Sequence, residues 1–192
     1  MTSAFTIRSA SPCDLTDLAR FARYTYLEAF GSDMDEIALQ DHLEKRMSDD
    51  LFSEMISTDT FFLAHESNTL VGFLQLGIVD PFYQKFLDCF DIGASEIRRL
   101  YVLPARQNAG LGSALLRRGI EELVSTGSVY VTTWESNTGA QRLYQRFGFS
   151  KIGQIPEYNN KGELNGYEHI MVRLGNVWNT EQEAEKLLSP HS

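Results

Sequence analysis

Two glycines stand where a strand-like pattern gives way to a helical one, and this stretch of the chain is well suited to bind a ligand. In order, it contains Gln107, Asn108, Ala109, Gly110, Leu111, Gly112 and Ser113. The first backbone N–H groups of a helix have no partner inside the helix, and the helix dipole adds positive potential there. Glycine lacks a Cβ, so a pyrophosphate can approach the backbone closely. The stretch therefore predicts a site for a phosphate-bearing ligand.

The elements on either side must position this turn. Residues 97–102 have the pattern of a strand, and Leu103 and Pro104 end it because proline cannot donate to a strand ladder. Beyond the turn, apolar residues recur at helical spacing. These residues are Leu111, Leu115, Leu116, Ile120, Leu123 and Val124. We expect a strand, a glycine turn and a helix in succession.

The glycines alone leave the ligand open. A nucleoside-triphosphate loop would need a lysine after the second glycine, but Ser113 follows Gly112 directly. A dinucleotide fingerprint would need a third glycine where Leu115 stands. A plain turn that binds nothing is a further alternative. Motifs elsewhere in the chain are needed to distinguish a turn that binds nothing from a site for another phosphate-bearing ligand.

Composition excludes several functional classes. The chain has 192 residues and 43% hydrophobic residues, which fits one globular domain. Its formal net charge of −9 argues against binding nucleic acid through phosphates. It could steer cationic partners toward the surface, or simply keep the protein soluble. Cys13 and Cys89 are too few for a disulfide framework, and no apolar run has membrane-spanning length. We expect a soluble cytoplasmic protein with no membrane partner.

The first half of the chain alternates between the periodicity of strands and that of helices. A strand is expected near residues 5–8, and Asp14 is a candidate N-cap for the helix that follows. Further helices are expected at residues 35–47 and near residues 51–56. Two strands, residues 61–64 and 71–79, should be joined by a turn at residues 67–69. The connection 80–93 contains aromatic residues that we expect to be packed rather than exposed. They are Phe82, Tyr83, Phe86 and Phe90.

The second half of the chain continues the alternation of strands and helices, and the order of elements in both halves predicts an α/β domain with a mixed sheet. Residues 129–134 form a strand pattern rich in β-branched and aromatic residues. A cluster of cap formers at residues 135–138 then starts a helix that Gly148 ends. Strands are expected at residues 149–152 and 167–174, and an acidic tail, residues 175–192, contains one candidate helical segment.

Several motifs in this order resemble one family. Gln107, Gly110 and Gly112 match the Q/R-x-x-G-x-G/A signature of the GNAT superfamily of N-acetyltransferases. Three further segments support the match. They are Leu100-Tyr101-Val102, Trp134-Glu135-Ser136-Asn137 and, after Leu143-Tyr144, Phe147-Gly148-Phe149. The chain is thus similar to a GNAT domain over residues 1–174. The segment Thr25-Tyr26-Leu27-Glu28-Ala29-Phe30 resembles the bacterial spermidine/spermine branch.

The resemblance implies a fold and a cosubstrate. A GNAT fold has a mixed, mostly antiparallel central sheet with splayed central strands, flanked by helices. Acetyl-CoA would place its pyrophosphate on the amides of residues 108–113. Its pantetheine arm would extend along Leu100, Tyr101 and Val102, pairing with their backbone as an added strand does. An N–H of Tyr101 or Val102 could then polarise the thioester carbonyl.

The resemblance also assigns roles to three side chains. Tyr144 would be the general acid that protonates the CoA thiolate, and the alternative is a core aromatic. Asn137 would hydrogen-bond the pantetheine arm, or cap its helix. Glu96 would be the general base, and the alternative is a surface ion pair. Arg98 stands where the polyamine branch typically has a second acid, which weakens the prediction of a polycationic substrate. The histidines lack metal-ligand spacing, so no metal is expected.

Together these features predict direct transfer of acetyl from acetyl-CoA to a primary amine of a small molecule, with a polyamine as one candidate. The alternatives are acetylation of a protein N-terminus or lysine, a non-catalytic CoA sensor, and an interaction domain whose glycine turn binds nothing. Small family members are often dimers, so a homodimer is one expectation.

Overall fold

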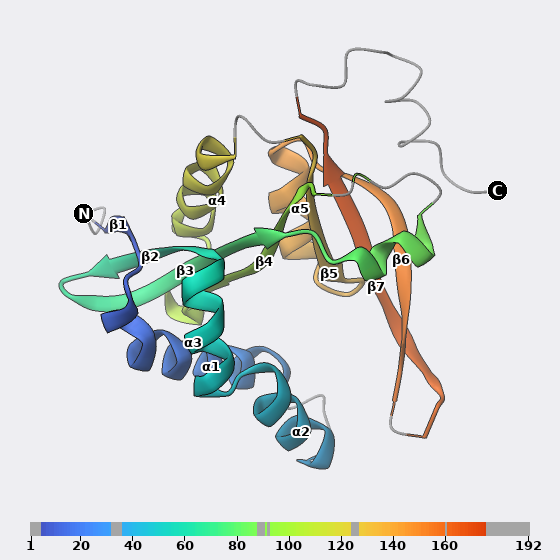
Figure 1. Cartoon of the computed structure of the whole chain (residues 1–192), viewed down its shortest axis with the longest axis horizontal. Coiled ribbons are helices and arrows are strands. Elements are labelled where there is room, and N and C mark those ends of the chain that lie inside the picture. Colours follow the sequence, from blue (N-terminus) through green and yellow to red (C-terminus); the bar gives the residue numbers. More distant parts are fainter. Residues whose placement is uncertain are drawn as a thin grey trace. The chain divides into compact units, whose positions relative to one another are not determined.

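A computed structural model describes residues 5–31, 36–87, 91, 93–123, 127–159 and 161–175 (Figure 1). Contacts divide the chain into two compact units. The first unit comprises residues 1–76 and 99–119, and the second comprises residues 77–98 and 120–192. The predicted tail helix lies outside the described residues.

The seven strands have the order β1-β2-β3-β4-β5-β7-β6. In the first unit, β1 (Thr6–Ser9) pairs antiparallel with β2 (Thr60–Glu66), and β2 pairs antiparallel with β3 (Thr69–Ile78). Ser67 and Asn68 join β2 to β3 with φ angles of 47° and 68°, so the turn predicted at residues 67–69 is confirmed as a tight hairpin. The last residues of β4 (Ser95–Val102) also belong to this unit.

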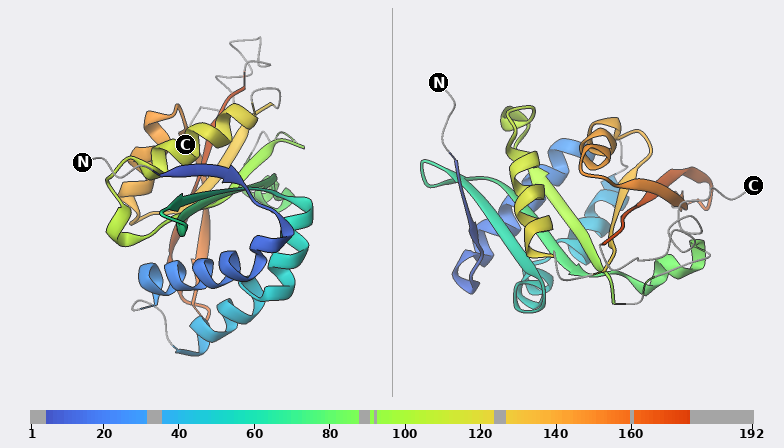
Figure 2. Two further views of the ribbon diagram at one scale, coloured as in Figure 1. Left: turned by 90° about the vertical axis from the view of Figure 1, so that its left-hand side faces the viewer. Right: turned by 90° about the horizontal axis from the view of Figure 1, so that it is seen from above.

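Helices cover both faces of the first unit's strands (Figure 2). They are α1 (Leu15–Phe30), α2 (Glu36–Arg46), α3 (Asp49–Thr58) and the part of α4 (Leu111–Glu122) up to Gly119, with short 3-10 turns η1 (Pro12–Asp14) and η3 (Pro104–Arg106). Alternation along β3 explains the two layers, because successive side chains point to opposite faces. Phe73 meets Phe21 of α1 with ring centroids 6.0 Å apart, whereas Leu74 lies against Gly119 of α4.

In the second unit, β5 (Val129–Trp134) lies between β4 and β7 (Leu164–Arg173) in the sheet. Its pairing with β4 is parallel and joins Ser95–Ile97 to Val129–Val131. Its pairing with β7 is antiparallel, as is that of β7 with β6 (Ser150–Tyr158). Helix α5 (Thr138–Arg146) and the 3-10 segment η2 (Pro81–Phe86) complete this unit. The predicted mixed, mostly antiparallel sheet flanked by helices is confirmed.

The hairpin of β6 and β7 is longer than the sequence pattern predicts (Figure 1). The polar residues near its tip look like a loop, yet Tyr158 pairs with Leu164 and Glu157 pairs with Gly166. The side chain of Asn159 closes the turn by accepting the backbone N–H of Glu163 at 3.0 Å. A strand that exposes its side chains lacks the apolar alternation on which strand prediction depends.

Aromatic residues of η2 are divided between the core and the surface. Tyr83 is buried with Val79 and Tyr130 in the core of the second unit, as predicted. The prediction for Phe82 is wrong, because that side chain is 43% exposed. Lys85 lies over its ring at 4.7 Å, and Phe86 lies beside it. Phe90 lies outside the described residues. Within the described ranges we find no helix of the length and apolarity that a bilayer crossing requires.

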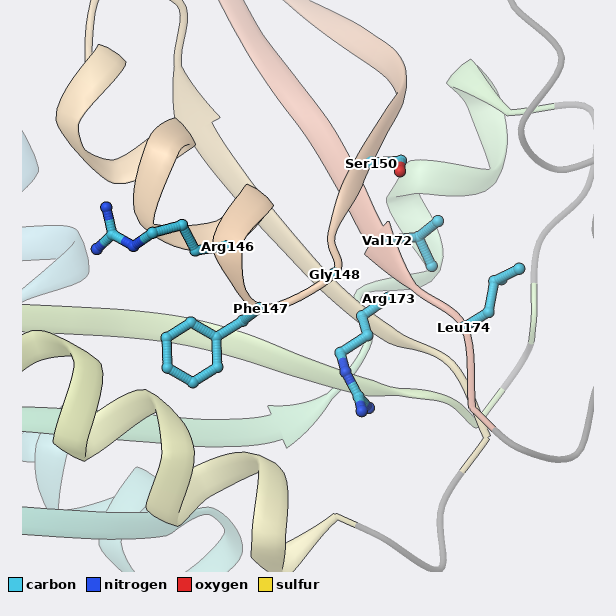
Figure 3. A pocket seen from close by; sticks show the side chains of 7 residues that line it. All are labelled: Arg146, Phe147, Gly148, Ser150, Val172, Arg173 and Leu174. Carbon is cyan, nitrogen blue, oxygen red and sulfur yellow. The ribbon is translucent and has the colours of Figure 1, made fainter.

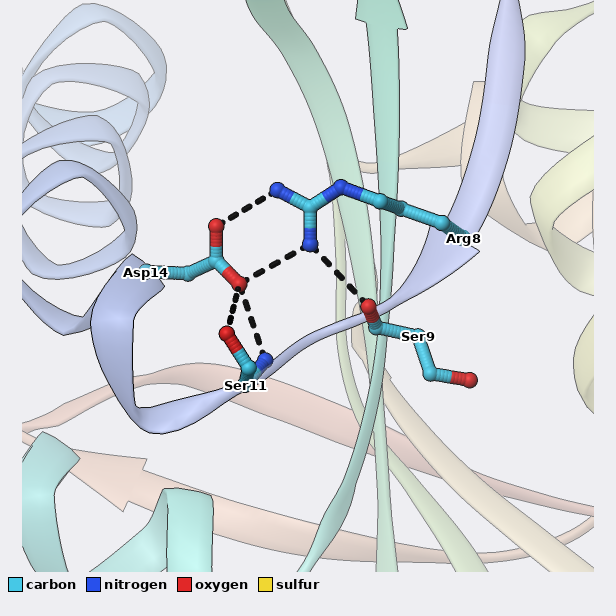
Figure 4. A network of polar contacts seen from close by, with 4 residues as sticks. All are labelled: Arg8, Ser9, Ser11 and Asp14. Carbon is cyan, nitrogen blue, oxygen red and sulfur yellow. Dashed lines mark hydrogen bonds and ion pairs between the residues drawn. The ribbon is translucent and has the colours of Figure 1, made fainter.

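A polar network joins the end of β1 to the start of α1 (Figure 4). Arg8 donates to both carboxylate oxygens of Asp14, at 2.9 and 2.5 Å, and to the backbone carbonyl of Ser9. The backbone N–H and hydroxyl of Ser11 donate to the same carboxylate at 2.8 and 2.9 Å. Asp14 occupies the predicted N-cap position of α1 but makes no side-chain cap bond to that helix. Its carboxylate instead ties the preceding turn to the strand.

We expect Asp14→Asn to lower the free energy of unfolding by about 1 kcal/mol near neutral pH, because Arg8 is half exposed and the pair is screened. The hydrogen bond from Arg8, with those from Ser11, lowers the pKa of Asp14 below its usual value. The stability from this carboxylate is therefore present above the ordinary aspartate pKa and is lost as the pH falls toward the lowered pKa. Urea unfolding across that acidic range should show wild type and variant converging. Asp17→Asn, which removes only an exposed pair with Arg20, is the control and should change little.

Candidate active site

The glycine turn has the backbone geometry that the sequence predicts. Asn108 and Gly110 have φ angles of 59° and 85°, which lie in the left-handed region. Helix α4 begins at Leu111, and the backbone N–H of Ala114 donates to the carbonyl of Gly110 at 3.0 Å. A Cβ at Gly110 would meet no atom within 4 Å, so the space above this residue is open. The turn thus presents a helix N-terminus beside an open backbone, which suits an anionic ligand.

The turn is attached to the end of β4 within the first unit. The side-chain amide of Gln107 donates to the carbonyl of Val102 at 3.4 Å, and the backbone N–H of Leu103 donates to Val71 at 3.0 Å. The ring of Tyr101 packs edge-on against Phe73 at 5.3 Å. The side chain of Tyr101 therefore belongs to the core, and what this residue can offer a ligand is its backbone.

Glu96 is the buried acid of the second unit, with only 5% of its surface exposed. Its Oε1 accepts a short hydrogen bond from the phenol of Tyr83, and its Oε2 accepts the backbone N–H of Asp80 at 3.3 Å. Burial raises the pKa of Glu96, while the hydrogen bond from Tyr83 and the charge of Arg98 act in the opposite direction. The alternative of a surface ion pair is wrong for this side chain. A buried carboxyl with a raised pKa is a suitable proton acceptor near neutral pH.

The two arginines that follow on β4 have different surroundings. Arg98 lies across Gly77 and donates to the carbonyl of Ile78 at 2.9 Å, within the second unit. Arg99, in the first unit, donates to Gln75 at 2.5 Å and to the backbone carbonyl of Arg46 at 3.0 Å. Both guanidinium groups thus have protein partners, so their positive charge is partly neutralised by local dipoles.

Helix α5 carries the other two predicted side chains. The Oδ1 of Asn137 accepts the backbone N–H of Ala140 at 3.1 Å, which makes Asn137 the N-cap that the sequence allows. Its side-chain N–H₂ is not used in that bond. Tyr144 is 5% exposed and its ring lies 5.7 Å from that of Phe149. This side chain is packed as a core aromatic would be, and its ionisable group is the phenolic hydroxyl.

A hollow of about 430 Å³ lies on the second unit, where α5 ends (Figure 3). Its lining comes from the end of α5, the start of β6 and the end of β7. The residues are Arg146, Phe147, Gly148, Ser150, Val172, Arg173 and Leu174. No sequence pattern indicates this hollow, and no predicted site residue lines it.

Comparison with known proteins identifies the family. A sequence model of the Acetyltransferase (GNAT) family matches residues 23–149, so the chain belongs to the GNAT acetyltransferases. These are transferases that use acetyl-CoA. A curated relative is the spermine/spermidine N(1)-acetyltransferase of Bacillus subtilis, 31% identical over 107 residues, or 54% of this chain and 62% of the relative. The mycothiol acetyltransferase of Amycolatopsis mediterranei is 31% identical over 98 residues, or 48% of this chain and 31% of the relative.

Solved structures confirm the fold. The PaiA N-acetyltransferase of Thermoplasma acidophilum, in complex with coenzyme A, superposes with a TM-score of 0.65 at 20% identity, covering 89% of this chain and 99% of that one. The structure of yncA from Salmonella typhimurium with acetyl-CoA also has a TM-score of 0.65, at 19% identity, covering 99% of this chain and 97% of that one. The chain matches about three-fifths of the length of the Bacillus relative.

The structure adds residues that the sequence analysis did not select. Tyr83 and Asp80 contact the carboxylate of Glu96, and the side chain of Thr132 lies beside the phenol of Tyr83. Tyr83 stands 13 positions before Glu96 in a segment without regular periodicity. No sequence spacing relates the two residues, so only the path of the chain through η2 could reveal the contact.

Proposed function

We propose that this chain is an acetyl-CoA-dependent N-acetyltransferase that transfers acetyl directly to a primary amine of a small molecule. The observation that carries the proposal is the buried, hydrogen-bonded carboxyl of Glu96 in a GNAT domain, because transfer to an amine needs a proton acceptor. A protein that only sensed CoA would have no use for that acceptor. Polyamines are the candidate acceptors that the named function of the Bacillus relative suggests.

Acetyl-CoA would bind through the backbone of the first unit. Its pyrophosphate would take the amides of residues 108–113 at the start of α4, where Gly110 leaves the space open. The pantetheine arm would follow Leu100, Tyr101 and Val102, which come after the three residues of β4 that pair with β5. The family resemblance gives the side-chain N–H₂ of Asn137, on the second unit, the role of a donor to the arm. The backbone N–H of Tyr101 or Val102 would donate to the thioester oxygen as negative charge develops there.

Two side chains carry out the proton transfers of the proposed reaction. The neutral amine attacks the thioester carbon and forms the new C–N bond. Glu96 accepts a proton from the amine, directly or through water. As the C–S bond breaks, Tyr144 donates its phenolic proton to the departing CoA thiolate. The two products are an amide and CoA in its thiol form, and no acetyl-enzyme intermediate forms. Proton exchange through water then restores the Glu96 carboxylate and the Tyr144 phenol.

The acceptor is the least constrained part of the proposal. The formal net charge of −9 favours a cationic acceptor through long-range steering. The positive charge of Arg98, near Glu96, opposes close approach of a polycation. A monoamine or a short polyamine satisfies both conditions better than a long polycation. Acetylation of a protein N-terminus or lysine is the alternative, because it would use the same acetyl-CoA site with a different acceptor.

Release of CoA thiol from acetyl-CoA should test the acceptor class. The panel contains spermidine, spermine, small monoamines, aminoglycosides, amino acids and short peptides. The proposal expects at least one small amine to give acceptor-dependent release above every peptide. Peptides outperforming all small amines would favour the protein-directed alternative. Acetyl-CoA binding with no acceptor-dependent release would favour a sensor.

We expect Gly110→Val to weaken acetyl-CoA binding about tenfold or more, because a β-branched residue resists the left-handed φ of 85° and would fill the open space above the turn. Isothermal titration would measure the dissociation constant. Gly162→Val is the matched control: Gly162 has a φ of 76°, also has open space around it, and lies in the turn between β6 and β7. Equal weakening by both variants would show that the loss reflects general strain.

A further inference from the structure

We propose that Tyr83 is a positioning residue that holds the carboxylate of Glu96 ready to accept the proton of the acceptor amine. This inference rests on the proposed function, in which Glu96 is the general base. The contact itself is a hydrogen bond from the phenol of Tyr83 to Oε1 of Glu96, between two side chains that are 8% and 5% exposed. Tyr83 therefore acts on the reaction through Glu96.

One short segment holds both oxygens of the carboxylate. Residues 80–83 supply the phenol of Tyr83 to Oε1 and the backbone N–H of Asp80 to Oε2, and we call these two donors the carboxylate clamp. The segment is fixed by its own bonds. The carboxylate of Asp80 accepts the N–H of Phe82 at 2.8 Å, and the carbonyl of Asp80 accepts the N–H of Tyr83 at 3.1 Å. These two bonds hold both donors of the clamp in place at the start of η2.

The side chain of Tyr83 is held from its other sides as well. Its ring packs in a core with Val79, Leu87 and Ala94. The side chain of Thr132 on β5 lies beside the phenol and lowers the pKa of Tyr83, against the larger effects of burial and of Glu96. The orientation of the carboxylate is thus set by a chain of contacts from β5 through η2 to β4.

The charges around the pair agree with this role. Glu96 is faced by Tyr83 and Asp80 from the η2 segment and by Arg98 from its own strand, and Tyr83 is also faced by Glu168 of β7. Burial, followed by the charge of Glu96, raises the pKa of Tyr83, so its phenol stays protonated and remains a donor. Burial raises the pKa of Glu96, and the bond from Tyr83 is the largest influence that lowers it again. Loss of that bond should leave the carboxyl protonated over a wider pH range.

The test is the pH dependence of kcat/KM in Tyr83→Phe. The variant keeps the ring and removes only the donor to Glu96. We expect the acid limb of the profile to move to higher pH by about one unit, because a hydrogen bond to a charged group has about that strength. On the acid side this means about a tenfold loss, with a much smaller change on the plateau. Tyr130→Phe is the matched control. It removes a fully buried phenol that contacts the backbone of Asp91, and its acid limb should not move.

A second readout does not depend on turnover. Carbon-13 NMR of labelled glutamate carboxyls, with the Glu96 signal assigned by its loss in Glu96→Gln, gives the titration of this carboxyl directly. The Glu96 signal should titrate at higher pH in Tyr83→Phe than in wild type. An unchanged titration would overturn the positioning role whether or not the protein acetylates any amine. A shifted titration in a protein without acetyltransferase activity would support the clamp and reject the proposed function.

If Tyr83→Phe does not fold, Thr132→Val serves in its place. It removes a hydroxyl that lowers the pKa of Tyr83, which makes the phenol a weaker donor, and it should move the acid limb and the NMR titration in the same direction by a smaller amount. Adding Tyr83→Phe to Glu96→Gln provides one more comparison. If Tyr83 acts through Glu96, the double variant should have the same pH profile as Glu96→Gln alone. A further shift in the double variant would show that Tyr83 acts on the reaction by another route.

Discussion

Tyr144→Phe should reduce kcat for acetyl transfer by about 10²-fold, while acetyl-CoA binds with nearly unchanged affinity. The variant keeps the aromatic ring that packs 5.7 Å from Phe149 and removes the phenolic hydroxyl with its proton. Without that proton the CoA thiolate has to leave unprotonated or take a proton from water. The effect should fall on the chemical step. Single-turnover kinetics with saturating acetyl-CoA would measure it.

The control for Tyr144→Phe is again a substitution of a buried tyrosine. Tyr130→Phe removes a phenol from the core of the second unit and reports the cost of losing a buried hydroxyl. Its kcat should stay within about twofold of wild type if the large loss in Tyr144→Phe is chemical. Thermal unfolding of both variants would separate activity from stability. A Tyr144→Phe enzyme that turns over as fast as wild type at all pH values would remove Tyr144 from the mechanism.

Glu96→Gln should lower kcat/KM by about 10²-fold or more near neutral pH, because the amide cannot accept the amine's proton. The loss should shrink at alkaline pH, where more of the acceptor amine is already neutral. A pH–rate profile for wild type and variant with the best acceptor would show the two curves approaching each other. A constant ratio between them would argue that Glu96 shapes the site without accepting a proton.

Measurements of the free energy of unfolding should show whether Glu96→Gln loses activity because of a folding defect. Because burial raises the pKa of Glu96 in the folded protein, the stability linked to this carboxyl is present below its ordinary pKa and decreases as the pH rises through the raised value. Glutamine stays neutral throughout, so Glu96→Gln should be at least as stable as wild type at alkaline pH. Urea unfolding at acidic and alkaline pH would measure both sides of this comparison. Marked destabilisation of the variant at alkaline pH would contradict the effect of burial described here.

The glycine turn of the first unit and the N-cap of α5 in the second unit could be predicted because their signals are local. Glycine and asparagine at residues 108–110 adopt the left-handed backbone that their small or self-bonding side chains allow, and Asn137 caps its helix as its residue type favours. The order of strands and helices follows from periodicity and from the resemblance together. These features depend on a few neighbouring residues, so sequence reasoning could find them.

The contacts of the candidate base could not be predicted in the same way. Glu96 in β4 and Tyr83 in η2 meet because Asp80 turns the chain back after β3. Residue type alone favours a surface ion pair for Glu96 as much as a buried base. The same limit applies to Asp14, whose residue type predicts a helix cap, whereas Arg8 draws its carboxylate into a different network. In both cases a partner distant in sequence decides what an acidic side chain does.

Transfer of labelled acetyl is the most direct test of the central claim. Wild-type protein would be incubated with acetyl-CoA labelled in the acetyl group, with and without the best amine of the panel, and label would be followed in amine, protein, acetate and CoA. Label should appear in an N-acetylated amine only when the acceptor is present, and none should be bound to protein. Tyr144→Phe should form the product about a hundredfold more slowly. Label on the protein before acceptor is added would contradict direct transfer. Label that never reaches any acceptor would contradict the assignment as an N-acetyltransferase.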